Sequence, residues 1–228
     1  MGLFKIVRRK EEDRYGIMAK KMYPRIEYMV VALVLFAVLL LVIPFSRSNT
    51  MQAMYISKWN EVYNRVDYMF SVMNAHVDDD MLKSLKNAQT TKDKEQILLA
   101  IVKPYLRINT DNIPSKFYKP KFKNGSNIPT DDRYYFDEFY FTKNRTIVGI
   151  KNIKTLNEND PFFIMMFDIN GLKRPNRFGV DIFGINIFDK GKIEPFGYDK
   201  TLNALQEDCS EAGTGISCSY YYKIGGEF

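Results

Sequence analysis

The feature that most constrains the fold is an uncharged segment from Tyr28 to Ser46, in which residues 29–43 read MVVALVLFAVLLLVI. A helix needs about 20 apolar residues to span a bilayer, so this segment is just long enough. The sequence therefore predicts one transmembrane helix over residues 26–46. A cleaved secretory signal is the alternative, and it is disfavoured because the run is too long for a signal core and no small-residue cleavage site follows it.

The charges on either side of this segment predict its orientation. Residues 1–25 carry eight Lys and Arg against three Asp and Glu, whereas the rest of the chain carries 25 against 24. The positive-inside rule places this basic arm in the cytoplasm and residues 47–228 outside. We therefore expect a single-pass protein of the inner (cytoplasmic) membrane with a periplasmic or extracellular domain. That domain is nearly neutral and shows no basic patch in its sequence, which argues against nucleic acid as a partner.

The first part of the outer domain, residues 47–107, is predicted to be helical. One apolar stripe recurs at steps of four and three, as in a helix that packs by one face; its members are Met51, Tyr55, Trp59, Val62, Val66, Met69 and Met73. Thr90 with Asp93 is typical of a capping box, and predicts a second helix that ends near Pro104.

The remainder of the domain is predicted to be a long loop followed by a sheet. Residues 108–131 are rich in Pro, Asn and Lys without a clear period, which indicates a surface loop. Residues 132–228 contain aromatic and β-branched runs at 133–142, 146–150, 162–169, 180–188 and 192–195, and the first two form a predicted hairpin. The expected fold class is α+β: a long N-terminal helix, transmembrane and then amphipathic, packed on a mostly antiparallel sheet.

The two cysteines favour a disulfide, and the sequence shows no catalytic motif. Cys209 and Cys218 lie nine residues apart in a domain predicted to be outside the membrane, which favours one disulfide over two free thiols. The chain has a single His, and no Gly-x-Ser-x-Gly, phosphate-loop or His-Glu-x-x-His motif. We therefore expect no enzymatic activity.

The N-terminal region resembles that of type IV pilins and type II secretion pseudopilins. Those proteins begin their mature chain with an aromatic residue, place a glutamate four residues later, and carry a helix-bending proline seventeen residues after it; Tyr23, Glu27 and Pro44 match this spacing. The resemblance implies that these residues serve assembly, and that Met22 and Tyr23 flank the processing site. Met22 stands where the family's peptidase requires glycine, so leader cleavage stays open.

A second segment resembles a recurring stretch of bacterial pilin-like proteins, DxNGxxxPNxxGxDxF. It runs from Asp168 to Phe183 between two apolar runs. Together the two matches imply a pilin-like structural subunit of a type IV pilus or a type II secretion pseudopilus. They imply as partners the membrane, other pilin or pseudopilin subunits in a homo- or hetero-oligomer, and the assembly platform. The alternative function is a membrane-anchored extracytoplasmic sensor or ligand-binding domain.

The same segment offers four oxygen donors within fourteen residues: Asp168, Asn170, Asn176 and Asp181. Hard cations such as Ca²⁺ take six to eight oxygens, which these side chains and nearby carbonyls would supply. The alternative is a tight turn at Asn170-Gly171 in which the acidic side chains bond the local backbone. No motif requires a cofactor, and Ca²⁺ is the one candidate.

Overall fold

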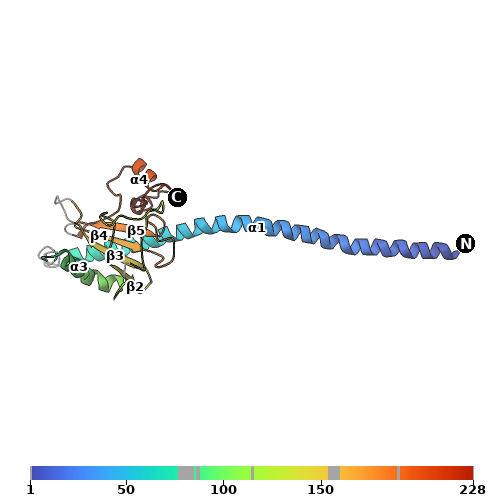
Figure 1. Cartoon of the computed structure of the whole chain (residues 1–228), viewed down its shortest axis with the longest axis horizontal. Helices are drawn as coiled ribbons and strands as arrows, with labels where there is room; N and C mark the ends of the chain where they lie inside the picture. Colours follow the sequence, from blue (N-terminus) through green and yellow to red (C-terminus); the bar gives the residue numbers. More distant parts are fainter. Residues whose placement is uncertain are drawn as a thin grey trace. The chain divides into compact units, whose positions relative to one another are not determined.

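The computed structural model divides the chain into two compact units, Met1–Met51 and Gln52–Phe228 (Figure 1). It describes the backbone of residues 2–76, 85, 88–113, 116–153, 160–188 and 191–227; within these ranges the side chains of residues 2–25, 41–49, 74, 76 and 110–112 are not described.

Helix α1, Gly2–His76, contributes residues to both units. Among the residues whose side chains are described, no helix is both long enough and apolar enough to cross a membrane. The predicted span includes residues 41–46, whose side chains lie outside this set. The side chains of Met22, Tyr23 and Pro44 lie outside it as well.

The second unit is built on a six-stranded antiparallel sheet with the strand order β1-β2-β3-β4-β5-β6. Every consecutive pair of strands is hydrogen-bonded, so the sheet is a meander. The α+β class and the antiparallel meander are thus confirmed. The strands are β1 Ile108–Ile113, β2 Phe139–Thr142, β3 Ile147–Asn152, β4 Phe163–Asp168, β5 Ile182–Ile187 and β6 Ile193–Pro195.

One face of the sheet packs against α1, α3 (Thr91–Leu106) and the C-terminal segment. The stripe predicted on α1 supplies much of this core: Tyr55, Trp59, Val66, Met69 and Met73 are buried, while Val62 is half-buried and Met51 exposed. Helix α3 begins as expected, with Thr90 as its N-cap accepting from the Asp93 N–H at 3.1 Å. It continues past the predicted end, because Pro104 lies within it and the helix closes at Leu106.

The opposite face of the sheet is also buried, so all six residues of β4 and of β5 are inside. The chain between β1 and β2 covers this face through Tyr118, Phe122, Ile128 and Phe136. The prediction of a surface loop over residues 108–131 is therefore wrong in two respects. Residues 108–113 form β1, and apolar side chains of the rest of the segment form a second core. The sequence did not indicate this burial, because the lysines of the segment alternate irregularly with its buried aromatic residues and no regular apolar period appears.

The C-terminal segment forms two short helices, α4 (Leu202–Asp208) and α5 (Cys218–Tyr221). It covers the α1 side of the sheet. The Trp59 indole N–H donates to the Ser219 carbonyl at 2.9 Å, and its ring stacks on Phe183 with centroids 5.3 Å apart. The last helix therefore holds α1 against β5.

Candidate functional site

The described apolar part of α1, residues 26–40, is exposed on every side. Its large apolar side chains have exposed fractions of 49% to 74%. Because a helical turn takes 3.6 residues, these positions cover the whole circumference of the helix. A helix that is apolar all round is normally covered by lipid or by other helices. Glu27 is the one charged residue in this stretch, and it is also exposed.

The four residues suggested as oxygen ligands are brought together in the loop between β4 and β5. Asp168 ends β4 with an exposed fraction of 0%, and Asp181, also 0% exposed, precedes β5. Asp168 Oδ2 accepts from the Tyr118 hydroxyl at 2.6 Å, and Oδ1 accepts from the Asn170 N–H at 3.1 Å.

The second buried carboxylate is saturated by N–H donors from its own loop. Asp181 Oδ1 accepts from the Arg177 N–H at 2.7 Å. Its Oδ2 accepts from the Asn176 N–H at 2.9 Å and from Asn170 Nδ2 at 2.8 Å. Asn176 takes the left-handed conformation, with φ 53°, which short polar side chains tolerate. The loop is thus folded around the Asp181 carboxylate.

The same loop contacts three other parts of the second unit. Asn170 Nδ2 donates to the Tyr55 hydroxyl of α1 at 3.2 Å. Gly171, at φ 72°, lies against the Arg145 carbonyl in the β2–β3 turn, where a Cβ would collide. Gly179, at φ 73°, would place a Cβ 2.6 Å from Cys218 Sγ. The two glycines therefore allow the loop to lie close against the β2–β3 turn and Cys218. Because residues 168–181 contact three other parts of the unit, we call this loop the structural hub.

Burial sets the protonation of this hub. Burial, and then the negative charge of Asp181, raise the pKa of Asp168 from 3.8 to about 8. Burial also raises the pKa of Asp181, against the opposing hydrogen bonds from Arg177 and Asn176. Burial and the nearby Asp168 raise the pKa of Tyr118 well above its usual value. The carboxyl pair therefore retains a proton at neutral pH.

The donor set fits a hydrogen-bonded turn better than a calcium site. All four carboxylate oxygens of Asp168 and Asp181 already accept hydrogen bonds, mostly from N–H groups that a cation would have to displace. Asn170 Oδ1 is buried and finds no hydrogen-bond partner among the described residues. Within the described ranges no three His, Cys, Asp or Glu side chains come close enough to hold a metal ion. Calcium binding stays a prediction.

The cysteine pair forms the expected disulfide, Cys209–Cys218, with Cα atoms 5.3 Å apart. The Asp208 carboxylate organises the loop that the bridge closes, since it accepts from the backbone N–H groups of Thr214 at 3.1 Å and Ser217 at 2.7 Å. Burial alone would raise the pKa of Asp208, but these bonds, with that of the Thr214 hydroxyl, lower it.

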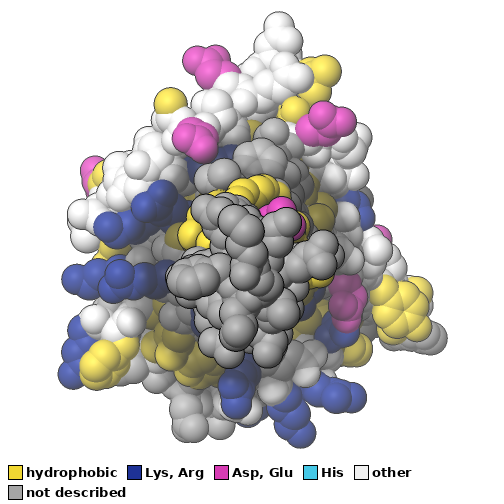
Figure 2. Space-filling view, turned by 90° about the vertical axis from the view of Figure 1, so that its right-hand side faces the viewer, with side chains coloured by type: hydrophobic (Ala, Val, Ile, Leu, Met, Phe, Trp, Pro, Cys, Tyr) yellow, Lys and Arg dark blue, Asp and Glu magenta, His cyan; other side chains and the backbone are white. Residues whose placement is uncertain are grey.

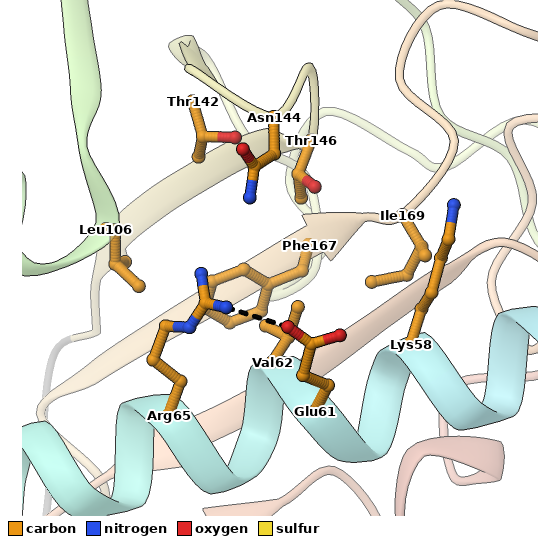
Figure 3. A pocket seen from close by; sticks show the side chains of 10 residues that line it. All are labelled: Lys58, Glu61, Val62, Arg65, Leu106, Thr142, Asn144, Thr146, Phe167 and Ile169. Atoms are coloured by element: carbon orange, nitrogen blue, oxygen red, sulfur yellow. Dashed lines mark hydrogen bonds and ion pairs between the residues drawn. The ribbon is translucent and has the colours of Figure 1, made fainter.

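A small pocket that the sequence did not indicate lies between α1 and the β2–β3 hairpin (Figure 3). Its volume is about 130 Å³. Residues 58–65 of α1 form one side, the hairpin turn 142–146 forms the opposite side, and residues 167–169 at the end of β4 lie behind. Neither periodicity nor a motif connects these three segments. Their juxtaposition is visible only in the folded chain.

Comparison with known proteins gives no match to a family model, to a curated protein or to a solved structure.

Proposed function

We propose that the chain is a structural or accessory subunit of a type IV pilus or type II secretion pseudopilus, held in the inner membrane by its apolar N-terminal helix and assembling through it. In this proposal residues 1–25 lie in the cytoplasm, and the second unit lies on the periplasmic or extracellular side. Partners are the membrane, other subunits of the same or related kind, and the assembly platform.

The observation that carries the proposal is the exposed apolar surface of residues 26–40. At about 25 cal/mol per Å² of apolar surface, leaving such a helix in water is strongly unfavourable. Lipid covers it in a monomer, and neighbouring helices cover it in a filament. Subunits that exchange lipid contacts for helix contacts assemble without a change in their folded domains.

Glu27 is assigned the role of setting register between subunits. A carboxylate at the edge of an apolar helix is tolerated while it reaches water or headgroups, and it needs a cation when a bundle closes around it. A free amino group at Tyr23 would supply that cation if the leader is cut after Met22. If the leader is retained, Arg25 or Lys21 of an adjacent chain takes this role.

The charge balance of the chain supports a protein partner over nucleic acid, because residues 26–228 carry 25 Lys and Arg against 24 Asp and Glu. On the face drawn in Figure 2, Lys and Arg side chains lie mainly along the left and lower margins, and Asp and Glu side chains lie on the same face. Proteins that bind nucleic acid usually concentrate Lys and Arg in one basic patch or stripe. The absence of catalytic motifs from the sequence is likewise in keeping with a structural role.

The test is crosslinking in cells through a single cysteine placed in the apolar helix, Val34→Cys. Chains with Glu27 intact should form crosslinked species with themselves or with other pilins, and Glu27→Ala should abolish them. Glu27→Asp is the matched control, because it keeps the carboxylate and should keep the crosslinks. Trp59 is the only tryptophan and is fully buried, so its fluorescence checks that the second unit stays folded.

The second candidate function is a membrane-anchored extracytoplasmic ligand-binding domain. The pocket in Figure 3 favours it, because it combines charged, polar and apolar groups in one opening. Chains with Glu27 intact that never crosslink would support this candidate against the assembly role.

A further inference from the structure

One end of the sheet gathers positive charge from segments that are far apart in the sequence. Strand β1 starts opposite the end of β2, and β4 ends opposite the starts of β3 and β5. The residue before β1, the β2–β3 turn and the β4–β5 loop therefore lie at the same end. They expose five cationic side chains, which we call the basic end: Arg107, Lys143, Arg145, Lys173 and Arg174.

Folding leaves these five charges without acidic partners among the described residues. The ion pairs found in the described second unit lie elsewhere, at Arg65–Glu61, Lys92–Glu138, Lys192–Glu194 and Lys200–Asp208. The carboxylates of Asp168 and Asp181 are fully buried and accept hydrogen bonds within the second unit. Because like charges repel one another, the basic end is unfavourable for the isolated unit, and an anionic partner would offset this repulsion.

A cleft of about 610 Å³ opens between the β2–β3 turn and the β4–β5 loop. Lys143, Arg145 and Lys173 line it, and no acidic side chain is among its described lining residues. Phe141 and Leu172 add apolar surface to the same cleft. The volume lies within the roughly 300–1,000 Å³ of small-molecule sites, so it accommodates a charged headgroup together with part of an apolar chain.

Leu172 gives the basic end an apolar tip. Its side chain is 53% exposed, and it directly precedes Lys173 and Arg174. A single exposed leucine needs no explanation on its own. An exposed leucine among unpaired cations suits a bilayer interface, because the apolar side chain enters the acyl boundary while the basic groups stay at the headgroups.

The basic end is also the end at which α1 enters the second unit. Tyr55 lies three residues after Gln52, where that unit begins, and its hydroxyl accepts from Asn170 of the β4–β5 loop at 3.2 Å. Nine residues separate Tyr55 from Ser46, the end of the predicted membrane span, and nine residues reach about 30 Å at most. A chain anchored by that span therefore keeps its basic end within reach of the bilayer surface.

We propose that the basic end of the second unit docks on an anionic phospholipid surface. A lipid phosphate enters the cleft between Arg145 and Lys173, and Leu172 enters the acyl boundary. This inference rests on the proposed membrane anchoring and adds a lipid contact to it, which holds the folded unit against the bilayer before assembly. On the periplasmic or extracellular side, the headgroups are the anionic surface nearest to this end.

The test uses the full chain reconstituted with vesicles of phosphatidylcholine, alone or mixed with phosphatidylglycerol. A polarity-sensitive fluorophore is attached at Leu172→Cys, since Cys209 and Cys218 are bridged. We expect a blue shift of its emission that requires phosphatidylglycerol and is reversed by high salt, which screens exposed charges. The same fluorophore at Tyr68→Cys, an exposed position about 20 Å beyond Tyr55 along α1, should not respond.

Two matched double variants separate the basic end from the overall charge of the chain. Lys143→Gln with Lys173→Gln should lower the ratio of docked to free loop about thirtyfold, because two cations leave the anionic surface. Lys92→Gln with Lys192→Gln removes the same charge from the opposite end of the sheet and should leave the shift unchanged. An equal loss in both double variants, or an equal shift without phosphatidylglycerol, would overturn the proposal.

Flotation of the same chain with vesicles of phosphatidylcholine alone reports the anchor separately. A chain that floats with these vesicles but shows no shift at position 172 with phosphatidylglycerol refutes the docking surface and leaves the anchor intact. A chain that does not float with them, but shows the shift with phosphatidylglycerol, refutes the anchor and supports the docking surface.

Discussion

Replacing Asp168 by asparagine tests how the buried carboxyl pair makes the free energy of unfolding depend on pH. Asparagine keeps the size and planarity of the side chain, and its oxygen can still accept from the Asn170 N–H. When Oδ2 of Asp168 carries the proton, it donates to the Tyr118 hydroxyl, and the amide nitrogen of asparagine at the same place donates to the same hydroxyl. The variant thus imitates the neutral acid at every pH.

The expected magnitude follows from proton linkage. The folded-state pKa of Asp168 is raised from 3.8 to about 8, so between these values the folded chain holds a proton that the unfolded chain has released. The free energy of unfolding must then fall as pH rises through this window, by about 1.4 kcal/mol per pH unit for one proton. From pH 5 to pH 7 the free energy of unfolding should therefore fall by roughly 3 kcal/mol through Asp168.

Urea unfolding of the detergent-solubilised chain, followed by Trp59 fluorescence at pH 5, 6, 7 and 8, measures this slope directly. In Asp168→Asn the free energy of unfolding should fall less steeply with pH, by the slope that belongs to about one proton. This variant should therefore be more stable than the unaltered chain at pH 8. Asp131→Asn is the matched control, because Asp131 is exposed and should leave the slope unchanged. A slope that survives in Asp168→Asn, or a variant less stable than the unaltered chain at pH 8, would refute the assignment of the proton to Asp168.

Two further predictions concern the C-terminal bridge and the loop. Thiol labelling of unreduced, denatured protein should find no free cysteine, and Cys209→Ser should lower the free energy of unfolding by about 2–3 kcal/mol on the chain-entropy model; two labelled thiols would contradict the bridge. If Ca²⁺ binds the loop, added calcium should raise the melting temperature in proportion to RT ln(1 + [L]/Kd), and Asp181→Ala should remove the effect. A melting temperature indifferent to calcium leaves the hydrogen-bonded turn as the role of these oxygens.

Much of the fold could be predicted because it is encoded locally. The stripe through Trp59 and Val66 has the helical period, and Thr90 is followed by an acid at the capping position. Strand runs such as β4 are short, apolar and bounded by turn residues. Each of these signals lies within one element, so a single sequence suffices to find it.

The contacts of the site depend instead on residues distant in the chain. Tyr118 bonds Asp168 from 50 positions away, and nothing in the lysine-rich stretch around Tyr118 marks it as buried. The inward position of Phe122 is equally hidden, because this segment covers the sheet without regular secondary structure of its own. The four oxygen-bearing residues of the loop could be named from sequence, but the N–H groups that donate to the carboxylates of Asp168 and Asp181 could not.

The bond between Trp59 and Ser219 has a consequence for the order of synthesis. The two residues are 160 positions apart. Phe183 stacks on the indole, and Tyr222 packs edge-on against Phe183. During synthesis the α1 stripe is made well before the segment around Ser219 that covers it. The indole of Trp59 can therefore reach its hydrogen-bond partner only after about 160 further residues have been added. Stalled or truncated chains lacking residues 219–222 should be the ones that quality control removes.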